Sequence, residues 1–161
     1  MAESIRIREL DKHDNSKVAT LSKQLADDGV PCSFWGLSQD DVQTLLEAPN
    51  KITLVAVSSS EVVGIGTVTR GEFYQSHLAE LSVAVCPKHR RLGIARSIVQ
   101  GLEEVSISKE IELLKALIWT ENIPSRRLFE QLGYEHRSIL YAEFKSAEFG
   151  EIDDCVYYKR I

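Results

Sequence analysis

Basic side chains crowd into one short stretch of a chain whose formal net charge is −5: Lys88, His89, Arg90, Arg91 and Arg96. Apolar residues recur at helical spacing over residues 94–105, so this stretch lies at a predicted helix start. The helix macrodipole disfavours cations at that end. Free N–H groups and the close backbone approach that a glycine allows at position 93 would instead suit a diphosphate. The spacing therefore indicates an anion site, and a solvated basic patch is the alternative.

Two common nucleotide-binding fingerprints, Gly-x-x-x-x-Gly-Lys-Ser/Thr and Gly-x-Gly-x-x-Gly, do not fit this stretch. Residues 83–95, VAVCPKHRRLGIA, instead resemble the acyl-CoA signature of the GNAT N-acetyltransferase superfamily. Arg90, Gly93 and Ala95 match its Arg/Gln-x-x-Gly-x-Gly/Ala core. Residues 122–134, NIPSRRLFEQLGY, are similar to a second block of that family, Asn-x-x-Ala/Ser-x-x-Leu-Tyr-x-x-x-Gly-Phe.

The resemblance implies that the chain binds acetyl-CoA as an acetyl donor. The four histidines are scattered, with no pair at the i, i+4 spacing of metal ligands, so no metal site is expected. The resemblance also implies that the strand at 79–86 splays from the strand at 113–119 and opens a cleft for the thioester. The cofactor-binding residues that it implies are Val83, Ala84, Val85, Arg90, Arg91, Leu92, Gly93, Ile94, Ala95, Arg96, Asn122, Ser125 and Phe129.

A carboxylate near the thioester would help the reaction, because an amine attacks only in its neutral form. Glu80 stands at the start of the strand that carries the signature, where GNAT-like enzymes often have a catalytic glutamate. We expect Glu80 to deprotonate and bind the acceptor, and an exposed carboxylate on a half-solvated strand is the alternative. Glu72 and Glu121 are rivals that lie near loops.

The proton donor for the departing thiolate is less evident. The family position usually held by tyrosine is Phe129 here, which has no proton to give. We expect Tyr141, on the strand that enters the last hairpin, to replace it, and water is the alternative. Tyr134 is expected to pack in the core. Cys86 is expected to be a small buried residue and not a nucleophile, since no histidine pattern accompanies it.

The acceptor site is expected in irregular parts of the chain, which often carry function. Phe34 and Trp35 lie in a loop between the first two predicted helices. These rings either line a pocket or anchor the loop on the core. With Glu80 and Tyr141, they are the expected substrate-binding residues.

The elements that must position these residues follow from periodicity and from breaks at glycine and proline. Strands are predicted at 4–10, 52–57, 62–69, 78–86, 113–119, 138–144 and 154–158. Helices are predicted at 15–26, from Ser38 to near Pro49, at 94–105 and from Pro124 to Gly133. This order predicts an α/β (α+β) fold, with a mixed, mostly antiparallel sheet of six to seven strands flanked by about four helices, as in GNAT proteins.

Length and composition limit the remaining choices. A chain of 161 residues with 43% hydrophobic residues fits one domain, residues 1–161. No apolar stretch approaches the roughly 20 residues of a membrane span. Three scattered cysteines argue against a disulfide framework and favour a cytoplasmic location. The acidic balance argues against nucleic acid as a partner and weakly favours a cationic acceptor, and a homodimer is compatible with the sequence.

The sequence thus predicts an N-acetyltransferase that moves the acetyl group of acetyl-CoA directly to a primary amine of a small molecule or of a peptide N-terminus. A non-catalytic acyl-CoA-binding or regulatory module is the alternative, because Phe129 replaces the usual tyrosine. The identity of the amine, the preferred acyl chain and the oligomeric state are left open.

Overall fold

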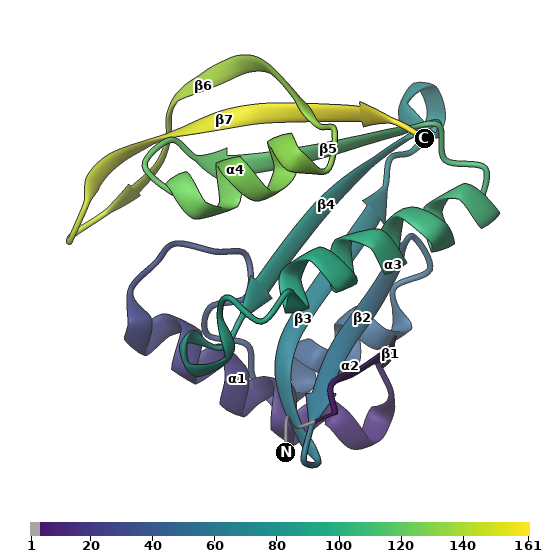
Figure 1. Ribbon diagram of the computed structural model, residues 1–161, viewed down its shortest axis with the longest axis vertical. Helices are drawn as coiled ribbons and strands as arrows, with labels where there is room; N and C mark the ends of the chain where they lie inside the picture. Colours follow the sequence, from purple (N-terminus) through teal and green to yellow (C-terminus); the bar gives the residue numbers. More distant parts are fainter. Residues whose placement is uncertain (1–3) are drawn as a thin grey trace.

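The computed structural model describes residues 4–161, and residues 1–3 of the predicted domain lie outside the described residues. Within 4–161, seven strands form one sheet in the order β1-β2-β3-β4-β5-β7-β6 (Figure 1). The strands are β1 (Arg6–Glu9), β2 (Lys51–Ser58), β3 (Glu61–Arg70), β4 (Leu78–Val85), β5 (Leu113–Trp119), β6 (Glu135–Ser146) and β7 (Gly150–Arg160). The α-helices are α1 (Asn15–Asp28), α2 (Gln39–Glu47), α3 (Ile94–Ser108) and α4 (Ile123–Gln131). Short 3-10 turns are η1 (Lys12–Asp14), η2 (Phe73–Gln75) and η3 (Pro87–His89).

The strand pairing confirms a mixed, mostly antiparallel sheet. In the described part of the chain, β4 and β5 are parallel and every other neighbouring pair is antiparallel. The predicted order of strands and helices is confirmed, but β6 and β7 run beyond the predicted ranges 138–144 and 154–158. Most β6 side chains are exposed, so no apolar alternation in the sequence marks where this edge strand begins and ends. None of the helices in residues 4–161 is long and apolar enough to cross a membrane.

Helix α3 packs closely on the sheet because β3 carries glycines beneath it. A Cβ atom at Gly66 would lie 2.4 Å from Cγ2 of Ile98 and 3.0 Å from Cδ1 of Leu102. Ile98 and Leu102 are fully buried. Helices α1 and α2 cover the other face of β2 and β3, and α4 lies on the same side as α3 (Figure 1). The close fit fixes the N-terminal end of α3 against the end of β4.

The second helix begins where the sequence predicts. Ser38 accepts a hydrogen bond from the N–H of Asp41 at 3.1 Å, and the Asp41 carboxylate accepts from the N–H of Ser38 at 2.8 Å. This reciprocal capping satisfies donors that the first turn of a helix leaves free. Helix α1 ends at Gly29, whose φ of 82° is the left-handed conformation that glycine adopts without strain. The two ends fix the loop at residues 29–38, which lies beside the site described below.

The Gly66→Ala variant tests the packing of α3. The added methyl group would have to displace Ile98 in a dense core, and such overpacking costs about 1–3 kcal/mol. We expect a lower urea midpoint with an unchanged m-value. Glu61→Ala, at an exposed position of the same strand, should change the free energy of unfolding by less than about 0.5 kcal/mol. A Gly66→Ala protein as stable as the parent would contradict the packing.

Candidate active site

The parallel ladder between β4 and β5 stops while both strands continue. Pairing runs from Leu78 opposite Leu113 to Leu81 opposite Ala116, whereas β4 extends to Val85 and β5 to Trp119. The predicted splay is therefore present, and the two strands diverge visibly in Figure 1. Backbone groups of residues 82–85 that face β5 have no strand partner there. Such groups need another hydrogen-bonding partner if they are to be shielded from water.

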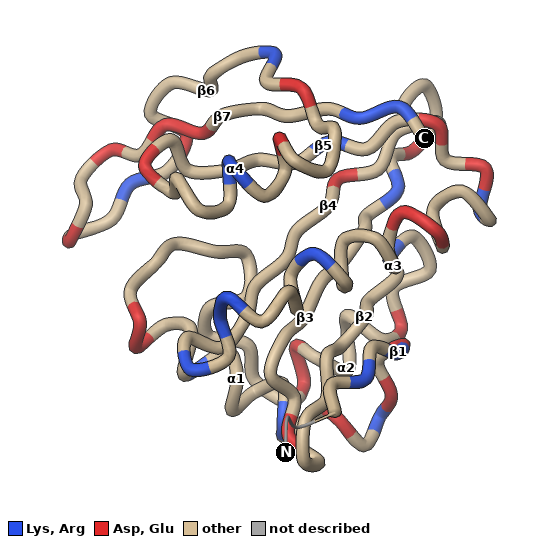
Figure 2. The backbone as a smooth tube through the Cα atoms, in the orientation of Figure 1, with Lys and Arg blue, Asp and Glu red and all other residues tan. Residues whose placement is uncertain are grey.

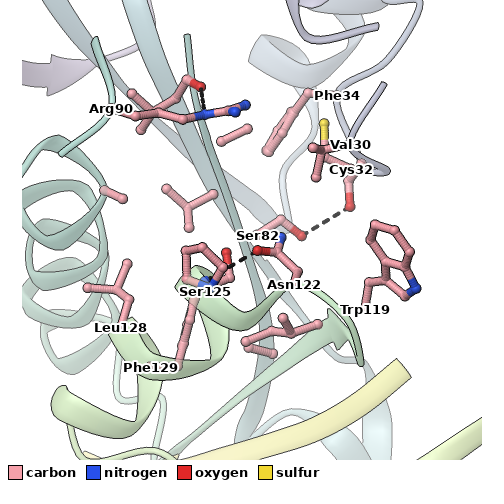
Figure 3. Close-up of a pocket in the computed structure, with 18 of the residues that line it drawn as sticks. Val30, Cys32, Phe34, Ser82, Arg90, Trp119, Asn122, Ser125, Leu128 and Phe129 are labelled. Carbon is pink, nitrogen blue, oxygen red and sulfur yellow. Dashed lines mark hydrogen bonds between the residues drawn. The ribbon is translucent and has the colours of Figure 1, made fainter. Parts of the chain in front are cut away.

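A cavity of about 650 Å³ opens at this divergence. Its walls come from the loop at 30–34, from β4 at 81–85, from the basic turn and start of α3 at 89–91 and 93–96, from β5 at 116–119, and from parts of 121–129. Figure 3 shows side chains from the loop, both strands and α4 around this space. The cavity thus joins the two sequence blocks, 83–95 and 122–134, although 26 residues separate them in the chain.

The turn before α3 leaves donors open at the cavity. Gly93 has a φ of 75°, and an added Cβ would meet nothing within 4 Å. No side chain caps the helix at this position, so the first N–H groups of α3 keep their capacity to bind an anion. Arg91 has a φ of 63°, a conformation that costs energy in a residue with a Cβ and that is frequent at functional sites. The turn therefore has the room and the donors that a diphosphate requires.

Basic and acidic residues gather in different parts of the molecule. Figure 2 shows Lys and Arg in the turn before α3, and several Asp and Glu along the β6–β7 hairpin. The basic turn contributes Arg90, Arg91 and Arg96 to the cavity lining, whereas the acids of the hairpin lie outside the lining.

Two of the arginines hold the turn in place. Nη2 of Arg90 lies 2.7 Å from Oδ2 of Asp28, and its Nε donates to the carbonyl oxygen of Val85 at 3.3 Å. Nη2 of Arg96 donates to Oε1 of Gln131 at 2.7 Å, which links α3 to α4. Both arginines line the cavity, but their guanidinium groups already have partners in the protein. Leu92 is 62% exposed and does not line the cavity.

The second sequence block contributes the start of α4. The Asn122 side chain accepts a hydrogen bond from the N–H of Ser125 at 3.3 Å, and both residues line the cavity. Phe129 also lines it, and its ring lies 4.9 Å from that of Tyr134 in an edge-to-face arrangement. Tyr134 is buried, and this burial, followed by the charge of Glu103, raises the pKa of its hydroxyl. Tyr134 is a core residue and not a ready proton donor.

The loop between α1 and α2 forms another wall of the cavity, next to the basic turn. Phe34 is buried and lines the cavity, and its carbonyl oxygen accepts from Oγ of Ser22 at 2.5 Å. Phe34 therefore both anchors the loop and shapes the cavity. Trp35 lies outside the lining and is 36% exposed. Oγ of Ser33 lies 3.3 Å from Oγ of Ser82, which brings the loop against β4 (Figure 3).

Glu80 lies outside the cavity lining. It stands on β4 before the strands separate, directly opposite Lys115, and Oε2 of Glu80 is 3.6 Å from Nζ of Lys115. Its role as a base stays a prediction. Glu121, its rival, does line the cavity.

Tyr141 also lies outside the lining and is 83% exposed. It belongs to an irregular part of β6, where the register with β7 shifts between Leu140 and Phe144. Ala142 in that segment has a φ of 49°. The local distortion explains why strand alternation is a poor guide to where this side chain points. Its role as an acid likewise stays a prediction.

Two residues that the sequence did not single out stand beside the cavity. Trp119 ends β5 and lines the cavity, and its ring centroid lies 4.9 Å from that of Phe149. Asp154 is the partner of Trp119 across the β5–β7 ladder and is only 5% exposed. Burial, then the charges of Glu143, Glu80 and Asp153, raise the pKa of the Asp154 carboxyl. A carboxylate at a predicted strand start gives no sign in the sequence that it will be buried.

Comparison with known proteins agrees with this geometry. A model of the Acetyltransferase (GNAT) family matches residues 22–134, which is more than half of the chain. An acetyltransferase of the GNAT family from Streptococcus pneumoniae has a structure that superimposes with a TM-score of 0.87, at 18% sequence identity over 98% of this chain and 100% of that chain. The chain therefore belongs to the GNAT family of acetyltransferases, and it is an acyltransferase.

Two further structures share the fold. A ribosomal-protein-alanine N-acetyltransferase from Brucella melitensis gives a TM-score of 0.86 at 23% identity, covering 97% of this chain and 99% of that chain. A putative acetyltransferase from Salmonella typhimurium, solved with its cofactor acetyl-CoA, gives 0.85 at 20% identity, covering 97% of this chain and 93% of that chain. Identities this low establish the common fold and leave the acceptor open.

The Asp154→Asn variant tests the electrostatic state of the buried carboxylate. A raised pKa in the folded protein means that ionisation of Asp154 costs stability as pH rises above the unfolded value of about 3.9 and through the folded value. We expect Asp154→Asn to be more stable than the parent at pH 7–8, by about 2–4 °C in Tm for each kcal/mol relieved. The advantage should shrink toward pH 4. This sign would be contradicted if the difference in Tm between variant and parent were smaller at pH 8 than at pH 4.

Proposed function

We propose that this acyltransferase moves the acetyl group of acetyl-CoA directly to a primary amine of a small molecule or of a peptide N-terminus. The observation that carries the proposal is the end of the β4–β5 ladder beside an uncapped helix start. It offers unpaired strand backbone and anion-binding N–H groups in one cavity. Acetyl-CoA, the co-substrate typical of GNAT proteins, would supply an activated acetyl thioester in this cavity.

The donor would occupy the wall formed by β4 and the basic turn. Backbone groups of Val83, Ala84 and Val85 would bind the pantetheine arm in place of a neighbouring strand. The N–H groups of residues 91–96 would bind the diphosphate, with the open space at Gly93 admitting it to the main chain. Arg90 would act by holding the turn through Asp28. Asn122, Ser125 and Phe129 would border the arm from the α4 side.

Direct transfer fits the cysteines better than a covalent enzyme intermediate does. Cys86 is buried, and its Sγ donates to Oε1 of Gln24 at 3.4 Å. Cys32 lines the cavity, but burial raises the pKa of its thiol and so reduces the thiolate that could attack. No histidine hydrogen-bonds to either thiol within the described residues. The amine nitrogen would therefore attack the acetyl carbon directly and form a tetrahedral intermediate, from which the carbon–sulfur bond then breaks.

Two separate proton transfers are needed: one from the attacking amine and one to the departing thiolate. Glu80, at the base of the divergence, would take the amine proton through water, since it does not reach the cavity wall itself. Glu121 is the alternative base within the wall. Unpaired backbone N–H groups at residues 82–85 would stabilise negative charge on the carbonyl oxygen. Phe129 cannot protonate the leaving thiolate, so Tyr141 or water would supply that proton.

The Gly93→Ala variant tests where the diphosphate binds. Its Cβ would stand in the open space that the phosphates would use, so we expect CoA to bind at least about tenfold more weakly, or about 1.4 kcal/mol, by calorimetry. Gly150→Ala is a matched control, because Gly150 also has a positive φ (69°) and no atom within 4 Å of an added Cβ. Equal CoA affinity in both variants would refute the placement.

Release of free thiol from acetyl-CoA, measured across peptides, amino acids, polyamines and aminoglycosides, tests the transfer itself. We expect acceptor-dependent thiol with at least one of these amines. Glu80→Gln should lower kcat/KM by about 10²-fold or more, a typical contribution of a general base, with the largest loss at low pH. An unaltered rate would reject Glu80 as the base and leave the transferase proposal standing. CoA binding without thiol release from any acceptor would favour the binding-module alternative.

A further inference from the structure

Asp154 is a buried carboxylate without a side-chain partner among residues 4–161. It is 5% exposed, and no hydrogen bond or ion pair in residues 4–161 reaches its side chain. The polar side-chain atoms that are fully enclosed without a partner in this part of the chain belong to Asn15, Thr53, His89, Ser106 and Tyr134. The Asp154 oxygens thus keep a narrow opening to solvent. A carboxylate in this state is costly unless a cation joins it.

The surroundings of Asp154 add negative charge. Glu143, Glu80 and Asp153 all act on its carboxyl, and Glu80 is itself paired with Lys115. Asp153 is held elsewhere, because its Oδ1 accepts from the N–H of Ala142 at 2.7 Å. Among the described residues, no group of three or more His, Cys, Asp or Glu side chains is placed to hold a metal ion. An organic ammonium group therefore fits as the cationic partner of Asp154 better than a metal ion does.

The sheet places Asp154, which is not itself part of the cavity lining, beside a residue that is. Directly opposed residues of an antiparallel ladder point to the same face, so Asp154 and the cavity-lining Trp119 lie side by side. The Trp119 ring packs on Phe149, and aromatic faces next to a carboxylate suit an alkylammonium group. Glu148, at the tip of the same hairpin, lies close to Gly29, so the hairpin meets the α1–α2 loop on this side.

The position of Asp154 argues against contact with the reacting nitrogen. That nitrogen must lie between β4 and β5, where the strands part, whereas Asp154 is on β7, beyond β5. Neighbouring strands are about 4.8 Å apart, so the two points are separated by about 5–10 Å. A bare carboxylate would also favour the protonated amine, which cannot attack. The group that Asp154 binds must be a second cation on the same acceptor.

We infer that Asp154 selects acceptors that carry a second ammonium group a few carbon atoms from the amine that is acetylated. This inference rests on the proposed function and names the substrate class of the same site: linear diamines and longer polyamines, in preference to monoamines. Trp119 and Phe149 would contact the carbon chain between the two nitrogens.

The experiment compares butane-1,4-diamine with butylamine on the parent protein, on Asp154→Asn and on Glu151→Gln. Glu151 is exposed on the same strand and provides a matched loss of charge. Calorimetric titration into protein saturated with CoA measures binding without requiring turnover. We expect the diamine to bind the parent more tightly than butylamine, and Asp154→Asn to weaken it by about 30-fold or more. Glu151→Gln should leave the affinity unchanged.

Steady-state rates separate this inference from the proposed function. Asp154→Asn should raise KM for the diamine and leave kcat and the KM for acetyl-CoA nearly unchanged, which a general loss of structure would not do. Failure of the diamine to bind the parent, or equal binding by the parent and Asp154→Asn, overturns the inference. Thiol release with other amines would then still support the transferase. Diamine binding that Asp154→Asn weakens, without thiol release from the diamine, would overturn the inference that diamines are acceptors. Absence of thiol release from any amine would overturn the proposed acetyl transfer.

Discussion

The fold depends on one interrupted ladder. β4 and β5 pair as parallel strands only as far as Leu81 and Ala116, and each then continues along its own path. The sheet remains one unit below that point, while above it the two halves present unpaired backbone to a shared cavity. Beyond Leu81 and Ala116, the β4–β5 pair therefore lacks the hydrogen bonds that a continuous ladder would have. A ligand that supplies hydrogen bonds to the same groups would complete the sheet without becoming part of the chain.

Close packing around β3 and β4 keeps this opening in a fixed geometry. The glycines of β3 bring α3 onto the sheet, and the left-handed backbone at Arg91 and Gly93 directs the chain from β4 into that helix. Buried apolar side chains therefore determine where the first N–H groups of α3 point. The anion-binding capacity of the turn is a consequence of core packing as much as of its basic side chains. This explains why two of its arginines can be engaged in structural contacts.

Much of the fold could be predicted because its signals are local. Periodicity, Ser38 as a cap and Pro87 after a strand define the elements, and both sequence blocks contribute residues to the cavity lining. The acceptor side could not be predicted in the same way, because it depends on contacts between distant segments. The place of Glu80 in its strand predicts a cavity residue, but β4 and β5 are still paired at that residue. In the sequence Asp154 resembles an ordinary surface acid, whereas in the sheet it lies between β5 and β6 and is buried.

The ion pair between Arg90 and Asp28 joins the basic turn to the end of α1. Asp28 is the last residue of α1, and the loop that carries Phe34 begins at the next residue. Arg90 belongs to the turn on which the diphosphate would rest. This one contact therefore holds together two walls of the cavity, so a substitution of Asp28 or Arg90 would alter the turn and the loop at once.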